Sequence, residues 1–373
     1  MQLNEKPAPF MVRGEGSYLW DEQGRRYLDF IQGWAVNCLG HDPPVLREAL
    51  AAERVLNPGP AFHNAPSHAL ATLLAELSGL ERVFLSCSGA EANEGAVKLA
   101  RKWGQLHRDG AFEVITTQEG FHGRTLAMSS ATGKPGFADA FGPHVPGFVK
   151  APYGDVAAVE QAVGPRTVAV MVEPIQGEAG AVTPPAGYLA ALRAVCDRHG
   201  ILLIVDEIQT GMGRTGPLFA FQAEGIRPDL MTLGKGLGGG LPVSAVLARR
   251  EVACFARGDH GGTFAAHSWL SAGALAVVRT LLTVDRTRGA QALQRALSTI
   301  AERHGLRLRG RGHLWGLVLP RPQAEAIRAA CFTRGLLVNA ARPDVLRLMP
   351  ALDVGGPEIE AMASILTSVL AEA

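Results

Sequence analysis

The sequence has few cysteines, almost no net charge and no long apolar run, and each of these absences argues against a class of protein. Its 373 residues include only five cysteines and no Cys-x-x-Cys pair, so we expect neither a disulfide framework nor a zinc site. The formal net charge is only +1, which argues against a general nucleic-acid or membrane-surface binder. The longest apolar runs, such as Val168–Val172, are far too short to span a bilayer.

The sequence also lacks the patterns of a signal peptide, of a metal site and of a disordered chain. The first ten residues contain no apolar segment typical of a signal peptide, and the scattered cysteines suit a reducing compartment, so we expect a cytoplasmic protein. The histidines show no paired metal-ligand spacing, so no metal site is expected. Apolar residues make up 47% and charged residues 19%, a composition that excludes disorder as the main state.

Lysine is scarce as well. Only six of the 36 basic residues are lysines: Lys6, Lys98, Lys102, Lys134, Lys150 and Lys235. A reaction that requires a lysine therefore has few candidates in this chain.

The middle of the chain alternates between strand and helix patterns. The expected strands are Glu81–Ser86, Glu113–Thr117, Thr167–Val172, Ile201–Val205, Leu230–Leu233 and Val243–Leu247. Helical spacing is found over Ala90–Gly104 and Ala186–His199. Such alternation predicts an α/β fold with a mostly parallel sheet covered on both faces.

The pattern changes after about Trp269. We expect one long helical stretch to about Arg303, and then a smaller α/β lobe. Its expected elements are strands at His313–Leu319, Leu336–Asn339 and Val345–Leu348, and helices at Gln323–Arg334 and Pro357–Leu370.

An aspartate follows one of the most apolar strands. Asp206 comes directly after Ile201–Val205, at the carboxyl end of the strand, where open α/β sheets place ligand-binding groups. A carboxylate in that place can hold a protonated ring nitrogen. The alternative is a capping or surface acid.

A lysine flanked by glycines lies about one strand–helix–strand unit further along. Lys235 follows the strand Leu230–Leu233, and a shielded lysine can form a Schiff base. The neighbouring glycines would let the backbone approach a bulky cofactor. The alternative is a solvated loop lysine.

Two further segments offer groups for a phosphorylated, planar ligand. Ser88-Gly89-Ala90 opens a helix, whose free N–H groups can bind phosphate, although Ser88 also suits an ordinary capping box. Phe121 could stack on a planar ring, and Arg124 could bind a carboxylate. The alternative is that Phe121 packs in the core and that Arg124 is a surface cation.

Three more features bear on the site. The segment Glu173–Glu178 follows another buried strand of the same sheet, and Arg347 is a lone charge within an apolar strand. Gly211–Gly216 matches the dinucleotide pattern G-x-G-x-x-G, but five residues separate it from its strand and no clear helix follows. A nicotinamide-dependent dehydrogenase is therefore a remote alternative.

Taken together, the main pieces match one cofactor. Pyridoxal 5′-phosphate needs a Schiff-base lysine, an acid for its ring nitrogen, a phosphate cradle and a stacking surface. Each signal is weak alone, but all four occur in this chain.

From about Val12 onward the sequence resembles the class III, fold-type I aminotransferases, most closely the acetylornithine/ornithine branch. The stretches that carry the resemblance are Tyr18-Leu-Trp-Asp-Glu-Gln-Gly, Ala35-Val-Asn-Cys-Leu-Gly-His, Ser88-Gly-Ala-Glu-Ala-Asn-Glu, Phe121-His-Gly-Arg-Thr, Glu173-Pro-Ile-Gln-Gly-Glu, Asp206-Glu-Ile-Gln-Thr-Gly-Met-Gly-Arg-Thr-Gly and Gly234-Lys-Gly-Leu-Gly-Gly-Gly. The resemblance implies a homodimer with a shared active site. We expect an N-terminal segment (1–45) packing with the small domain, a large domain (46–268) that binds pyridoxal phosphate, and a small C-terminal domain (269–373).

The resemblance also implies roles at the cofactor. Lys235 would carry the cofactor as a Schiff base and move the proton, and Asp206 would pair with the ring nitrogen. Gln209 would contact the ring hydroxyl, and Phe121 would stack on the ring. The phosphate would be bound by Ser88, Gly89 and Ala90, together with Thr263 from the neighbouring subunit.

On the substrate side, the resemblance implies that Arg124 binds a carboxylate. Glu178 would pair with Arg347 while the amino donor is bound, and release it for the α-carboxylate of 2-oxoglutarate. Trp34 would line the entry. The implied reaction moves the ω-amino group of N-acetylornithine to 2-oxoglutarate in arginine biosynthesis. Ornithine, succinylornithine, lysine-pathway and 4-aminobutyrate donors stay open, as does a relative that binds the cofactor without turnover.

The chain departs from the family pattern in two places. Where the family usually reads Thr-Phe-Gly-Gly-Asn-Pro-Leu, this chain has Thr263-Phe-Ala-Ala-His-Ser-Trp-Leu. Larger residues at the glycine positions could alter the backbone beside the phosphate. Relatives also usually carry a longer segment before Val12, which helps to cover the active site.

Overall fold

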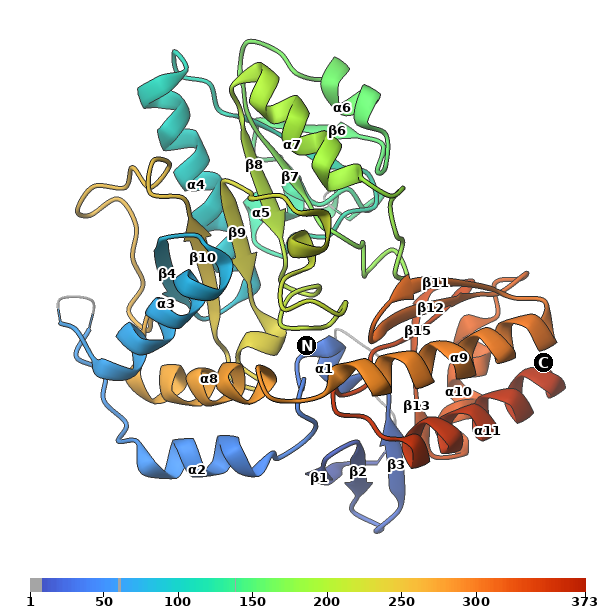
Figure 1. Ribbon diagram of the computed structural model, residues 1–373. Coiled ribbons are helices and arrows are strands. Elements are labelled where there is room, and N and C mark those ends of the chain that lie inside the picture. Colours follow the sequence, from blue (N-terminus) through green and yellow to red (C-terminus); the bar gives the residue numbers. More distant parts are fainter. Residues whose placement is uncertain (1–8, 60–61, 138) are drawn as a thin grey trace.

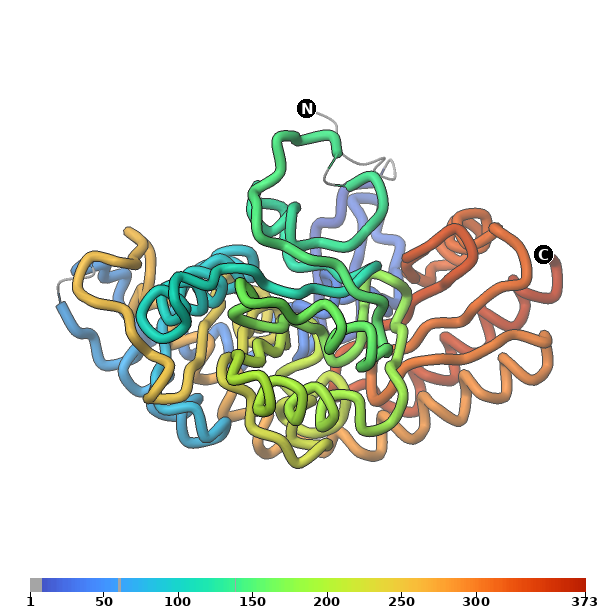
Figure 2. The backbone as a smooth tube through the Cα atoms, turned by 90° about the horizontal axis from the view of Figure 1, so that it is seen from above, coloured from blue at the N-terminus to red at the C-terminus, as the bar shows by residue number. Residues whose placement is uncertain are grey.

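The computed structural model describes residues 9–59, 62–137 and 139–373. Most of the N-terminal stretch in which no signal peptide is expected therefore lies outside the described residues. Figure 1 shows a large sheet with helices on both sides, and a smaller C-terminal part at one end of the molecule. In the view from above (Figure 2), the C-terminal part and the α2–α3 region lie at opposite ends.

A seven-stranded sheet forms the centre of the large part. Its strands, in spatial order, are β4 (Arg82–Ser86), β10 (Ser244–Ala248), β9 (Leu230–Leu233), β8 (Leu202–Asp206), β7 (Thr167–Val172), β5 (Glu113–Thr117) and β6 (Phe148–Ala151). The five strands from β9 to β6 are paired in parallel, whereas β10 runs antiparallel to both its neighbours. This topology confirms the predicted α/β class with a mostly parallel sheet.

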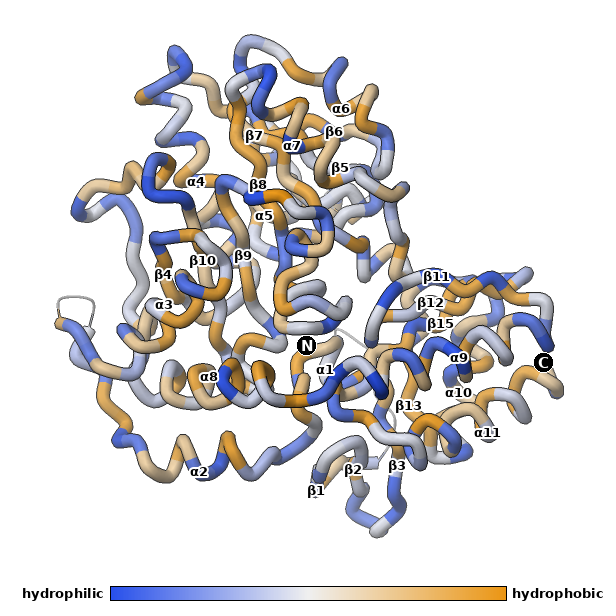
Figure 3. Tube along the Cα trace, viewed as in Figure 1, coloured by the Kyte–Doolittle hydropathy of each residue, from blue (hydrophilic) through white to orange (hydrophobic). Residues whose placement is uncertain are grey.

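The sheet is apolar because both of its faces are covered, and Figure 3 shows its central strands as largely hydrophobic. Val170 and Leu203 point into one core, which the side chains of α3, α7 and α8 complete. Met171 and Ile204 point to the opposite face, into a core shared with α4 and α5. The helices of this part are α2 (Pro44–Ala52), α3 (Ala65–Ser78), α4 (Gly89–His107), α5 (Leu126–Ala131), α6 (Val156–Gln161), α7 (Tyr188–His199) and α8 (Ser268–Leu281), with the 3₁₀ turns η1 (Asp139–Phe141), η2 (Ala220–Glu224) and η3 (Lys235–Leu237).

The C-terminal part has its own core. An antiparallel sheet consists of β11 (Arg307–Arg311), β12 (Leu314–Val318), β15 (Val345–Leu348) and β14 (Asn339–Arg342). Helices α9 (Arg286–His304), α10 (Ala324–Thr333) and α11 (Gly356–Glu372) pack on it.

The N-terminal segment joins this second core. Its elements are β1 (Met11–Glu15), β2 (Tyr18–Asp21), β3 (Arg26–Asp29) and the short helix α1 (Gln32–Ala35). Strand β3 pairs in parallel with β13 (Leu336–Leu337), and Leu28 and Phe30 are buried among C-terminal side chains. The division into segments 1–45, 46–268 and 269–373 stays a prediction.

The single helix expected over Trp269–Arg303 is wrong. It is two helices, α8 and α9, and they belong to different cores: Val277 packs with the large sheet, and Leu297 packs with the C-terminal part. Asp285 begins α9 by accepting a hydrogen bond from the Thr287 N–H (3.0 Å). The β-branched residues and the aspartate of Thr283-Val-Asp285 favour this break.

Candidate active site

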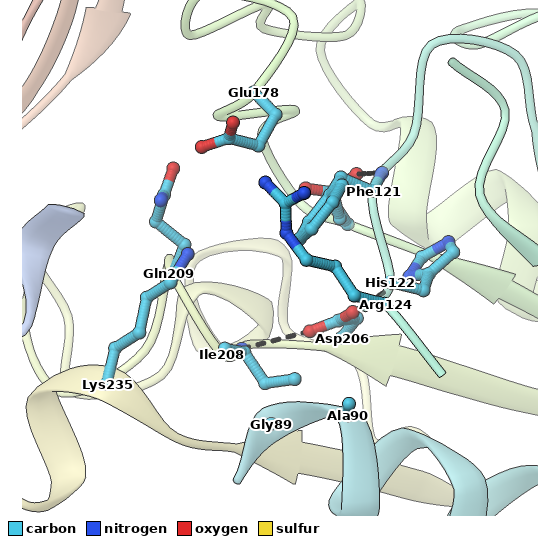
Figure 4. Close-up of a pocket in the computed structure, with 11 residues that line it drawn as sticks. Gly89, Ala90, Phe121, His122, Arg124, Glu178, Asp206, Ile208, Gln209 and Lys235 are labelled. Carbon is cyan, nitrogen blue, oxygen red and sulfur yellow. Dashed lines mark hydrogen bonds and ion pairs between the residues drawn. The ribbon is translucent and has the colours of Figure 1, made fainter. Parts of the chain in front are cut away.

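One edge of the large sheet gathers most of the residues that the sequence singled out. Strand β8 ends at Asp206, β9 is followed by Lys235, and β7 is followed by the Glu173–Glu178 segment. Because these strands are parallel, their carboxyl ends meet at the same edge. The result is a cavity of about 290 Å³ (Figure 4). It is lined by Gly89, Ala90, Phe121, His122, Arg124, Glu173, Glu178, Asp206, Ile208, Gln209 and Lys235.

Asp206 is held by hydrogen bonds at the floor of this cavity. Its carboxylate is 3% exposed, and Oδ2 lies 2.8 Å from both Asn93 Nδ2 and His122 Nδ1. Oδ1 accepts from the Ile208 N–H at 3.1 Å. Thr232 Oγ1 donates to Asn93 Oδ1 at 2.7 Å and fixes that amide in turn. A carboxylate held in this way keeps one orientation toward a ligand.

Sequence reasoning assigned no role to His122 or Asn93. Both are almost fully buried, and the Asn93 amide also donates to the His122 carbonyl (2.7 Å). Their positions in the sequence could have indicated that they lie near the site. Asn93 lies one helical turn beyond Gly89, and His122 directly follows Phe121.

Lys235 lies at the side of the cavity, beside Gln209 (Figure 4). It begins η3 with a φ of +41°, a left-handed conformation that costs on the order of 1–3 kcal/mol in a residue other than glycine. Burial lowers the pKa of its amino group, although the charge of Glu178 acts in the opposite direction. A lysine with a lowered pKa is more often neutral, and therefore a better nucleophile and proton carrier.

Gln209 presents an unsatisfied amide. The residue is 7% exposed, and its Nε2 has no hydrogen-bond partner among the described residues. A Cβ on Gly177 would lie only 1.5 Å from Gln209 Oε1, so a glycine is needed for this side chain to enter. The cavity therefore contains a buried donor available to a ligand oxygen.

A buried ion pair connects the cavity to the C-terminal part. Arg347 of β15 is 0% exposed, and its Nη1 donates to Glu178 Oε1 and to the Gly177 carbonyl, both at 2.7 Å. Burial would raise the pKa of Glu178, but the charges of Arg347 and Lys235 outweigh it and lower the pKa to about 2. Asn339 Oδ1 accepts from Arg347 Nε at 3.1 Å.

The N-terminus of α4 borders the cavity at Gly89 and Ala90. Ser88 is the capping residue: its Oγ accepts from the Glu91 N–H (3.3 Å), and Glu91 accepts from the Ser88 N–H (2.7 Å). A Cβ on Gly89 would lie 2.8 Å from Ile208, which explains the glycine. The first N–H groups of a helix have no acceptor within it, so they suit a phosphate.

Phe121 and Arg124 line another wall. The Phe121 N–H donates to Glu173 Oε2 (2.9 Å), and the Arg124 guanidinium lies 5.7 Å from the centre of the Phe121 ring. Arg124 itself is exposed. Glu173 also lines the cavity, as expected for the polar groups of the segment that follows β7 at this sheet edge. Burial and the charge of Asp206 raise its pKa well above the ordinary value, which favours a neutral carboxyl there.

Four expected site residues are not among those that line this cavity. Ser88 directly precedes Gly89, and Arg347 pairs with Glu178. The other two are Trp34 and Thr263. Trp34, in α1, is 49% exposed, and Thr263 lies in the exposed loop 256–267, where its carbonyl accepts from Asn57 Nδ2 (3.2 Å). In the altered turn that follows, Ala266 has a φ of +56°, so an alanine adopts a conformation that favours glycine. The roles of Trp34 and Thr263 stay predictions.

The dinucleotide alternative finds no support in the backbone. Residues 208–215 form turns, and no helix opens at the Gly211–Gly216 motif. Among the described residues, no group of three or more His, Cys, Asp or Glu could hold a metal ion. In the same part of the chain, no helix is both long and apolar enough to cross a membrane.

Comparison with known proteins decides the family. The family model "Aminotransferase class-III" matches residues 2–370. The chain belongs to the class III aminotransferases. It is 50% identical to acetylornithine aminotransferase 2 of Bordetella bronchiseptica, over 100% of this chain and 96% of that protein. It is 47% identical to acetylornithine aminotransferase of Ralstonia nicotianae, over 99% of this chain and 96% of that protein.

Solved structures agree. The N-acetylornithine aminotransferase of Stenotrophomonas maltophilia superimposes with a TM-score of 0.85 at 36% identity, covering 98% of this chain and 96% of that one. The ornithine aminotransferase of Toxoplasma gondii superimposes with a TM-score of 0.92 at 32% identity, covering 99% of this chain and 92% of that one. The predicted resemblance is confirmed, and so is the fold of a pyridoxal-phosphate-dependent aminotransferase.

The residues present fit pyridoxal phosphate, the cofactor of this class. A lysine of lowered pKa, a buried aspartate, an unpartnered amide donor and a helix N-terminus all face one cavity. These are the groups that bind an aldehyde, a ring nitrogen, a ring hydroxyl and a phosphate.

Proposed function

We propose that this aminotransferase moves the ω-amino group of N-acetylornithine to 2-oxoglutarate, yielding N-acetylglutamate 5-semialdehyde and glutamate, as a step of arginine biosynthesis. The observation that carries the proposal is the Glu178–Arg347 ion pair beside Lys235. The names of the full-length relatives support the choice of donor.

The cofactor, when bound, supplies an electron sink and carries the amino group between the two substrates. Lys235 would hold it, and would move a proton at Nζ once its amino group is released. Asp206 would bind the ring nitrogen in the orientation that Asn93 and His122 set. Gln209 Nε2 would donate to the ring hydroxyl, and Ser88, Gly89 and Ala90 would bind the phosphate.

The Glu178–Arg347 pair would let one cavity accept two different substrates. A donor that enters with its ω-amine first would leave the pair intact, because its α-carboxylate is at the far end of the molecule, where Arg124 would bind it. The α-carboxylate of 2-oxoglutarate would replace Glu178 on Arg347, and Arg124 would bind a second carboxylate. The guanidinium remains paired in both halves of the cycle, which a buried charge requires.

We also propose that the enzyme is a homodimer in which Thr263 reaches the phosphate of the neighbouring subunit. Large apolar side chains are exposed near its loop, among them Leu56 (52%), Phe62 (70%) and Phe264 (62%). Cys87 Sγ contacts the Phe264 carbonyl (3.6 Å), so this loop adjoins the N-terminus of α4. Sedimentation would give the oligomeric state, and Thr263→Ala should weaken cofactor binding. The free cysteines fit the cytoplasmic location that we propose.

The half-reaction with the donor tests the proposal. The protein is loaded with pyridoxal phosphate and mixed with N-acetylornithine in the absence of any oxo acid, while the absorbance of the cofactor is followed. We expect the band of the lysine-bound cofactor to be replaced by that of pyridoxamine phosphate. Addition of 2-oxoglutarate should then restore the first band.

Parallel samples rank the alternatives. Ornithine is included because solved structures of ornithine aminotransferases superimpose closely on this chain. Succinylornithine, lysine and 4-aminobutyrate complete the set. A faster reaction with one of these donors would replace N-acetylornithine in the proposal. If none of these donors changes the absorbance band, the result would favour a protein that binds the cofactor without catalysing amine transfer. That alternative rests on the altered turn after Thr263.

A further inference from the structure

A group of buried cationic and imidazole side chains lies apart from the cavity, where three segments meet. Arg214 belongs to the turns that follow β8, Arg286 is the first residue of α9, and His313 precedes β12. Arg214 is 2% exposed and His313 is 0% exposed, whereas Arg286 is half-buried. The group therefore joins the segment after Asp206 to the C-terminal part.

Backbone contacts fix the group. The His313 N–H donates to the Arg214 carbonyl at 2.8 Å, and Arg214 Nη1 returns a hydrogen bond to the His313 carbonyl at 3.2 Å. Arg214 Nη1 also donates to the Pro350 carbonyl. Arg286 Nη1 donates to the Leu281 carbonyl at the end of α8. These bonds use one nitrogen of each guanidinium and leave the others for a different partner.

Arg286 and His313 each pack against a segment that carries another member of the group. A Cβ on Gly213 would lie 2.7 Å from Arg286 Nε, so this guanidinium rests on the residue before Arg214. A Cβ on Gly289 would lie 3.4 Å from His313 Nε2, so the imidazole rests on the first turn of α9, which Arg286 begins. Burial and the charges of both arginines lower the pKa of His313 to about 3, and the imidazole is therefore neutral.

Four nitrogens of this group are buried without a hydrogen-bond partner in the described part of the chain: Arg214 Nη2, Arg286 Nε, His313 Nδ1 and His313 Nε2. Nη2 of an arginine carries two N–H groups and Nε one, and a neutral imidazole carries one N–H and one acceptor nitrogen. Donors thus greatly outnumber acceptors. No described carboxylate forms an ion pair with Arg214 or Arg286. A buried positive charge without a counter-ion is costly.

We propose that Arg214, Arg286 and His313 bind a small inorganic monoanion of the size of chloride or bromide. A halide only accepts hydrogen bonds, and it accepts them from several directions. It would therefore satisfy more of the surplus N–H donors than a water molecule, which must also donate. Its charge offsets that of the guanidiniums. Arg286 is half-buried, so the group lies near the surface of the protein at the start of α9. The bound anion would stabilise the contact between the segment after Asp206 and the start of α9.

Thermal unfolding of the full-length protein saturated with pyridoxal phosphate tests this site. The protein is dialysed into gluconate, an anion too large for the site, and bromide replaces gluconate at constant ionic strength. We expect Tm to rise by a saturable increment on the order of 2 °C. Arg286→Gln should remove the increment. The matched control is Arg288→Gln, which removes a 92%-exposed charge from the same turn of α9 and should leave the increment unchanged.

Crystals grown in bromide locate the anion. We expect an anomalous peak among Arg214 Nη2, Arg286 Nε and the His313 ring in the wild-type protein, and none there in Arg286→Gln. A Tm that does not respond to bromide would overturn the proposal. So would an increment that Arg286→Gln keeps in full, or a peak found only at Arg124 or Arg347 in the cavity. None of these outcomes depends on which amino donor the enzyme uses.

Discussion

The cavity has a buried side and an exposed side, and they are built differently. On the buried side, Asp206 and Arg347 lie on strands and Lys235 follows one; Asp206 and Arg347 are almost inaccessible to solvent, and each has several hydrogen bonds. On the exposed side, Arg124 lies in a connecting segment with open surroundings. Thr263, which does not line the cavity, lies in another exposed loop. The cofactor needs a fixed geometry, which a sheet edge provides, whereas substrates must enter and leave. Substitutions on the buried side should therefore have the larger effects.

The largest effect is expected at Lys235. Lys235→Ala removes the only amine that lines the cavity among the described residues, and should lower kcat by about 10⁴-fold or more. Borohydride reduction followed by mass spectrometry should label Lys235 in the wild-type protein and no lysine in the variant. Lys102→Ala is the control, since that side chain pairs with Asp259 outside the cavity. A labelled lysine in Lys235→Ala would place the cofactor elsewhere.

Arg347 should separate the two half-reactions. Arg347→Gln removes the buried cation that we expect to bind the α-carboxylate of 2-oxoglutarate, so that half-reaction should slow by about 10²–10³-fold. The donor half-reaction should change by less than about 10-fold, because the donor leaves this pair unused. Single-turnover absorbance measurements give both rates. Arg342→Gln, on the neighbouring strand and paired with Glu119, should leave their ratio unchanged. Equal losses of rate in both half-reactions would refute the proposal that the α-carboxylate of 2-oxoglutarate replaces Glu178 on Arg347.

A smaller effect is expected behind Asp206. His122→Asn removes the imidazole that lies 2.8 Å from Asp206 Oδ2, and should lower kcat/KM by about 10-fold through a less well oriented carboxylate. The dissociation constant of pyridoxal phosphate, measured by fluorescence, should rise as well. His144→Asn, at an exposed position, should alter neither value. Unchanged cofactor affinity in His122→Asn would mean that Asn93 and Ile208 suffice to hold Asp206.

The two sides also differed in how far the sequence could predict them. Asp206 and Lys235 were predictable because each follows a short apolar strand, and parallel strands bring such ends together. The pairing of Glu178 with Arg347 links residues 169 positions apart, so only family resemblance suggested it. His122 and Asn93 acquire their roles through contacts across the sheet, and local sequence does not encode those contacts. The α8–α9 break was missed because residues that favour helices, mainly alanine, leucine and arginine, occur on both sides of it, while the two helices pack in different cores.

The smallest effect is expected in the exposed loop outside the cavity, in the altered turn after Thr263. Ala266 has a φ of +56°, and Ala266→Gly removes the clash that a Cβ makes there, so we expect a gain of about 1 kcal/mol in the free energy of unfolding. The neighbouring Ala265 is not in the left-handed region, and Ala265→Gly should instead lose about 0.5 kcal/mol by freeing the unfolded chain. Denaturant titration measures both. Opposite signs at adjacent alanines would show that the loop keeps a glycine-type backbone without the glycine, and equal signs would contradict it.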